Sequence, residues 1–124
     1  MAIAVTRAAI EMEQRSDSVT PYEVIALLLD GALERVDQAQ QTLAKGNTEE
    51  AGELMARVID IINGLRGSLD FEQGGELAEN LDSLYGYIIE RLCAAEAETG
   101  DAVLAEANKL LAEVKSGWDG IAAA

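Results

Sequence analysis

At 124 residues, the chain is long enough for one domain with its own core and too short for two ordinary ones. A formal net charge of −14 excludes nucleic acid and anionic membrane surfaces as partners, because both require Lys/Arg patches that nine scattered basic residues do not supply. Apolar residues make up 49% but aromatics only 4%, so Ala, Leu, Ile and Val must build the core, and this composition favours helices.

The first 16 residues form a weakly patterned arm. Its apolar residues, among them Ile3 and Ile10, could form a short amphipathic helix or a frayed terminus. This stretch lacks the pattern of a signal peptide, and the longest apolar run, VIALLL at residues 24–29, is far below the roughly 20 residues that span a bilayer. We therefore expect a soluble, cytoplasmic protein.

A first helix is expected over residues 21–45. Thr20 is a candidate N-cap, Pro21 suits the first helical position, and Glu23 completes a capping box. Apolar residues then recur at steps of three and four until Gly46 provides a stop.

Three more helices follow at short intervals. Asn47 is the predicted N-cap of the second, which should end near Leu69. The sequence DFEQGG, residues 70–75, is the predicted turn, and a third helix runs from about Glu76 until ETGD interrupts it. Asp101 is the predicted cap of the fourth helix.

Four amphipathic helices joined by short turns can bury their apolar stripes only against one another. The sequence thus predicts an all-α protein, an antiparallel four-helix bundle with a short N-terminal arm or helix. The whole chain, 1–124, forms a single domain, with the arm at 1–16 and the bundle at 17–121.

The sequence offers few of the side chains that enzymes use for catalysis. The absence of His removes histidine phosphotransfer, Ser-His and Cys-His pairs and the Glu-x-x-His ligands of di-iron bundles. The lone Cys93 lies in an apolar stretch and is predicted to be a reduced thiol facing the core. The acidic stretch from Asp70 to Asp82 lacks the spacing of a Ca²⁺ loop, which favours a solvated corner over a metal site. We expect no enzyme activity, no cofactor and no metal.

Three segments carry a family resemblance: TPYEVIALLLDGAL, IINGLRGSLDFEQGGELAENLDSLYGYIIERLCAA and VKSGWDGI. In this order, between Val19 and Ile121, they resemble the FliS family of flagellin export chaperones. The resemblance implies a helical bundle that holds the disordered C-terminal segment of flagellin in the cytoplasm, blocks premature polymerisation and presents it to the flagellar type III export gate. A cochaperone is a further partner to consider, and the free protein is expected to be a monomer or weak dimer.

The resemblance also places the family's motif positions on this chain. They are Pro21, Leu28, Asp30, Gly31 and Ala32, then Ile61, Ile62, Leu65, Ser68, Leu69 and Asp70, then Leu81, Leu84, Tyr85, Tyr87, Arg91 and Leu92, and finally Trp118. Two departures are Leu29, where the family often has an aromatic residue, and an arm without the Tyr that many members carry.

A client-binding groove is expected along the apolar stripes. Its candidate residues are Ile25, Leu28, Leu29, Ile62, Leu65, Leu69, Leu84, Tyr85, Tyr87, Ile88 and Trp118. Apolar residues at this spacing are core residues by default, so many of these can serve the core alone. Tyr85 and Tyr87 point about 200° apart on a helix, so only one can face the core and the other is a candidate for contact with a partner.

Asp30 and Arg91 are charged residues within apolar sequence. Buried without partners they would be costly, so one interpretation is a structural pair between the first and third helices. The alternative is that both lie at the edge of a stripe with their charged groups in water.

Two other function classes remain open. One is a structural or oligomerising bundle without a client, in which apolar strips pair with another copy. The other is an enzyme with a site made of carboxylates alone.

The arm yields the first testable prediction. An empty apolar groove would expose a sizeable patch, and the arm, through residues such as Ile3 and Ile10, is expected to cover it reversibly. Deletion of residues 1–16 should tighten the binding of a flagellin C-terminal peptide modestly and increase self-association, because a closed cover lowers apparent affinity. Calorimetry and sizing chromatography measure both effects, and equal or weaker binding with unchanged solution behaviour would contradict the covering role.

Overall fold

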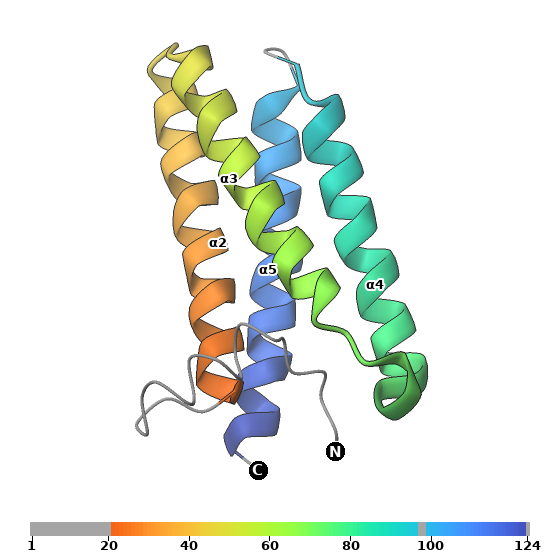
Figure 1. The fold of residues 1–124 in the computed structure, drawn as a ribbon. Helices are drawn as coiled ribbons and strands as arrows, with labels where there is room; N and C mark the ends of the chain where they lie inside the picture. The colour runs from red at the N-terminus through yellow and green to blue at the C-terminus, as the bar shows by residue number, and fades with distance from the viewer. Residues whose placement is uncertain (1–20, 97–98, 124) are drawn as a thin grey trace.

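A computed structural model describes residues 21–96 and 99–123, and they form four helices (Figure 1). The helices are α2 (Pro21–Ala44), α3 (Thr48–Gly67), α4 (Phe71–Ala94) and α5 (Gly100–Ala123). This confirms the predicted all-α bundle, and no strand occurs among these residues. The predicted arm with Ile3 and Ile10, and the predicted cap Thr20, lie outside the described residues.

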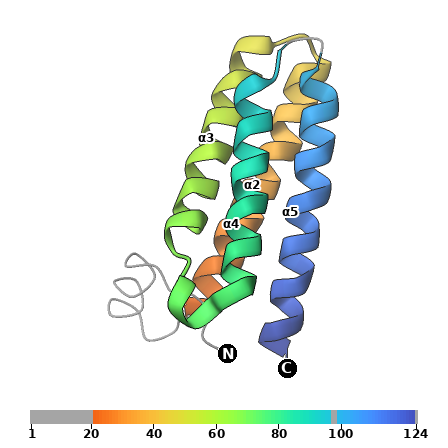
Figure 2. The same cartoon turned by 90° about the vertical axis from the view of Figure 1, so that its right-hand side faces the viewer.

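Successive helices run in opposite directions, as the two views at right angles show (Figures 1 and 2). Each helix packs against two neighbours, in the order α2, α3, α4, α5 around the bundle. The α2–α3 interface is the most extensive and the α4–α5 interface the least. The α2 and α4 helices are therefore diagonal, and their described backbones do not lie side by side.

Apolar side chains from all four helices fill the centre. The largest fully buried ones are Leu29, Val36, Val58, Ile62, Leu65, Ile88, Leu104 and Leu111. Burial of such a side chain stabilises the fold by about 1.5–3 kcal/mol. Among the described residues, every buried side-chain N or O atom has a hydrogen-bond partner. The core is thus apolar, as the spacing of the stripes predicts.

The helix boundaries follow the predicted signals at one end of the bundle. Gly46 has φ of 81°, and the Asn47 side chain accepts a hydrogen bond from the Glu50 N–H at 3.3 Å, which confirms the predicted stop and N-cap. The predicted cap of the fourth helix is wrong by two residues. The carbonyl of Thr99 accepts from the Val103 N–H at 3.0 Å, so α5 begins at Gly100 and Asp101 lies in its first turn.

The corner before α4 differs from its prediction. The helix begins at Phe71 rather than near Glu76, because the Asp70 side chain accepts from the Gln73 N–H at 3.1 Å and caps it. Gly75 then adopts φ 50° and ψ −127°, which kinks the chain after a single turn. The predicted turn of residues 70–75 is therefore a capped helical turn followed by a kink.

The kink predicts a stability effect at Gly75. An Ala side chain is strained at this φ and ψ, so Gly75→Ala should lower the free energy of unfolding by about 1–3 kcal/mol in urea denaturation. The control is Gly52→Ala within α3, where an added Cβ meets nothing within 4 Å. That change should raise stability by up to about 1 kcal/mol. Equal effects of the two substitutions would show that the kink is not a fixed feature in solution.

Candidate binding cavity

An apolar cavity of about 190 Å³ lies at the end of the bundle where α2 and α4 begin and α3 and α5 end. One wall comes from α4, through Leu77, Leu81 and Tyr85. The facing wall comes from α5, through Glu113, Val114, Gly117 and Trp118. The remaining lining comes from Ile25, Leu65, Ser68 and Leu69.

The cavity opens to solvent along the seam between α4 and α5. Its lining includes the exposed residues Leu77, Glu113 and Gly117, which come from these two helices alone. Ser68 is buried, and its hydroxyl donates to the Leu65 carbonyl at 2.6 Å, so it offers little to a ligand. Glu113 is the one charged residue in the lining. The site can therefore bury an apolar group and has a single carboxylate at its rim.

Polar contacts join α4 to α5 farther along the same seam. The Tyr87 hydroxyl donates to Glu106 Oε2 at 2.9 Å, and Arg91 Nε donates to Glu106 Oε1 at 3.1 Å. These two hydrogen bonds lower the pKa of the Glu106 carboxyl, and the bond to Glu106 raises the pKa of the Tyr87 hydroxyl. The α4–α5 seam is thus joined by hydrogen bonds at Glu106 and open to solvent at the cavity.

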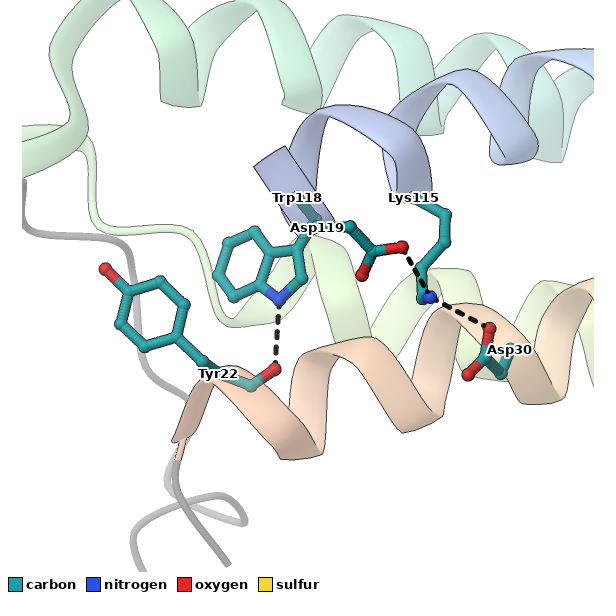
Figure 3. Close-up of polar contacts among 5 residues, drawn as sticks. All are labelled: Tyr22, Asp30, Lys115, Trp118 and Asp119. Carbon is teal, nitrogen blue, oxygen red and sulfur yellow. Dashed lines mark hydrogen bonds and ion pairs between the residues drawn. The ribbon is translucent and has the colours of Figure 1, made fainter. Parts of the chain in front are cut away.

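The end of α5 beside the cavity is attached to α2 instead (Figure 3). The Trp118 indole Nε1 donates to the Tyr22 carbonyl at 2.9 Å, and the two rings lie 5.0 Å apart at 34°. Lys115 Nζ lies 2.9 Å from Asp119 and 3.3 Å from Asp30. The α5 wall of the cavity is thus attached to α2.

The middle of α4, at Asp82, is attached to α3. Arg66 Nε donates to Asp82 Oδ1 at 2.6 Å, and this bond raises the pKa of Arg66. The guanidinium lies over Gly86, where an added Cβ would come within 3.1 Å of Arg66 Nη2. Around the cavity, polar contacts thus attach α5 to α2 and α4 to α3.

The structure divides the predicted groove residues into three groups. Ile25, Leu65, Leu69, Tyr85 and Trp118 line the cavity. Leu29, Ile62 and Ile88 are at most 1% exposed and lie outside the cavity lining. Leu28, Leu84 and Tyr87 lie outside the cavity lining, the first two half-buried and the third exposed.

The two tyrosines point in different directions, as the helical geometry predicts. Tyr85 is 3% exposed, and burial raises its pKa to about 12. Tyr87 is 43% exposed and bonded to Glu106. The core-facing tyrosine therefore lines the cavity, while the exposed one belongs to the α4–α5 contact.

Sequence reasoning missed part of the lining. Leu77, Leu81 and Val114 belong to the predicted apolar stripes, but Glu113 and Gly117 carry no apolar signal. All five lie at the same end of the bundle as Trp118. Their closeness to that end was the signal that could have identified them as lining residues.

The predicted Asp30–Arg91 pair does not exist. Their helices are diagonal, so Asp30 pairs with Lys115 and Arg91 with Glu106, both on α5. The side chains of Asp30 and Arg91 are 55% and 46% exposed, which agrees with the alternative that both lie at the edge of a stripe.

Two other predictions concern the surface. Cys93 is exposed on α4, one position past the buried Leu92, so the predicted core-facing thiol is wrong.

In the acidic corner, Asp70 caps α4 and Asp82 binds Arg66. Across the described residues, no group of three or more His, Cys, Asp or Glu side chains could hold a metal ion. None of the described helices has a stretch apolar enough to cross a bilayer.

The structure is that of an antiparallel four-helix bundle with an open apolar cavity at one end. The sequence matches, over residues 4–124, the model of the family described as Flagellar protein FliS. The flagellar secretion chaperone FliSB of Pseudomonas aeruginosa is 46% identical over 112 residues, which cover 90% of this chain and 89% of that protein. The chain belongs to the FliS family.

Two further relatives carry the same description. The flagellar secretion chaperone FliS of Salmonella typhimurium is 36% identical over 90% of this chain and 83% of its own length. That of Vibrio cholerae is 30% identical over 90% of this chain and 82% of its own length. The family is therefore one of flagellar secretion chaperones, and the names point to a non-enzymatic role.

The Glu106 contact predicts a pH-dependent stability. Because its pKa is lowered in the folded state, its contribution is present above the ordinary glutamate pKa and lost as pH falls through the lowered value. Glu106→Gln should therefore lower the melting temperature at pH 7, and this difference from the wild type should shrink below about pH 4. Glu53→Gln, on the exposed face of α3, is the control. A Glu106→Gln effect that is constant with pH would contradict the role of its charge.

Proposed function

We propose that this chain is a cytoplasmic export chaperone that binds the disordered C-terminal segment of flagellin, prevents premature polymerisation and delivers the segment to the flagellar type III export apparatus. The open apolar cavity between α4 and α5 carries the proposal. Apolar cavities of about 150 Å³ can hold a molecule the size of benzene, so this one has room for a large apolar side chain. Family membership supports the identity of the client.

An extended client suits the surroundings of the cavity. Leu77 in the wall is 42% exposed, and Phe71, two residues after the lining residue Leu69, is 51% exposed. Such apolar surface beside an open cavity favours a segment that anchors one side chain and lies along the seam, which is the manner in which grooves recognise amphipathic peptides. In this mode the chaperone needs neither nucleotide nor metal.

The binding test uses the C-terminal segment of Pseudomonas aeruginosa flagellin as a peptide. Isothermal calorimetry with excess chelator and no nucleotide should show a complex whose affinity falls only modestly at high salt, because apolar burial is weakly screened. Gly117→Leu should raise Kd by about tenfold or more, since an added Cβ there meets open space and the side chain would fill the cavity. Gly52→Leu, at the other end of the bundle, should leave Kd within about twofold.

Sizing chromatography on the same samples separates the alternatives. A wild-type protein that forms no complex but self-associates would favour the oligomerising bundle without a client. Equal binding by the Gly117→Leu and wild-type proteins would move the client site away from the cavity.

A further inference from the structure

Two carboxylates lie on the same face of α5, where it meets α4. Glu106 and Glu113 are seven residues apart, which is about two turns and about 10 Å along the helix. Glu106 accepts hydrogen bonds from Tyr87 and Arg91 of α4. Glu113 lines the cavity, whose opposite wall is formed by apolar side chains of α4. The same helix face therefore has one carboxylate with donors and one beside apolar groups.

The register of the two helices explains the difference. Because α4 and α5 are antiparallel, a step of seven residues forward from Glu106 matches a step of seven back from Tyr87 and Arg91. That step leads to Asn80 and Leu84, neither of which is a cation. Within the described part of the chain, Glu113 has no ion pair or side-chain hydrogen bond. The carboxylate at the rim of the apolar cavity thus has no ion-pair partner among the described residues.

Building on the proposed function, we propose that Glu113 determines which client segment fits the cavity. The client inserts an apolar side chain between α4 and α5 and places the cationic head of a neighbouring Lys or Arg against Glu113, as Arg91 does against Glu106. The net charge of −14 attracts the same cation at longer range. A client with a carboxylate at that position is disfavoured by like-charge repulsion, so the rim selects between segments of similar apolar content.

The test is a charge-exchange cycle with the Pseudomonas aeruginosa flagellin segment. Trp118 is the only Trp of the chain and lies in the cavity wall, so its fluorescence reports occupancy directly. Glu113→Gln should raise Kd about three- to tenfold and weaken its salt dependence, and Glu113→Lys should raise it further. Glu53→Gln, with the same change in net charge on α3, should change Kd by less than about twofold.

Peptide variants locate the partner of Glu113. Each Lys or Arg of the segment is replaced in turn by Met, and one replacement should weaken binding to the wild type yet have no effect on Glu113→Gln. The same position changed to Glu should bind Glu113→Lys better than the wild type.

The outcomes separate this inference from the function on which it rests. Tight binding that Glu113→Gln leaves unchanged, or that Glu53→Gln weakens equally, overturns the role of Glu113 and leaves the chaperone proposal intact. Absence of any peptide binding by the wild type overturns both.

Discussion

The hydrogen bond from the Trp118 indole to the Tyr22 carbonyl fixes the geometry on which the cavity depends. It holds the end of α5 against the start of α2, and the ion pair of Lys115 with Asp30 acts in the same direction one turn earlier. The open seam lies at the same end of the bundle as these contacts, where α5 is attached to α2.

The attachments of α4 complement this arrangement. Arg66 binds Asp82 on the side of α3, and Tyr87 and Arg91 bind Glu106 on the side of α5, farther from the cavity. These groups are well exposed, so each contact adds little to global stability. Their effect is on position, because they determine where along its length α4 is attached to α3 and where it is attached to α5. A client can then enter the seam without breaking the α2–α3 interface, the most extensive in the bundle.

Local periodicity predicted the helices and the core but not the depth of each side chain within it. The stripes of Leu29, Ile62 and Ile88 are indistinguishable in sequence from those of Leu65 and Tyr85, and only the position of the neighbouring helix decides which side chains line a cavity. Polar pairs depend on the order of helices around the bundle, which is why Asp30 was assigned to the wrong partner. The early start of α4 was missed because two adjacent glycines indicated a loop, whereas Gly75 alone takes the left-handed conformation next to a capped helical turn.

The cavity links the stability of the free protein to the binding of its client. The cavity is open to solvent, so part of its apolar lining remains in contact with water in the free protein. In the proposed complex, a client side chain that enters the cavity would cover this apolar surface, and its burial would favour association. Apolar filling discriminates poorly between similar side chains, with one methylene worth only about 1–3 kcal/mol. In the proposed complex, selection between similar segments would need a polar element at the rim, and Glu113 is the one charged residue in the cavity lining.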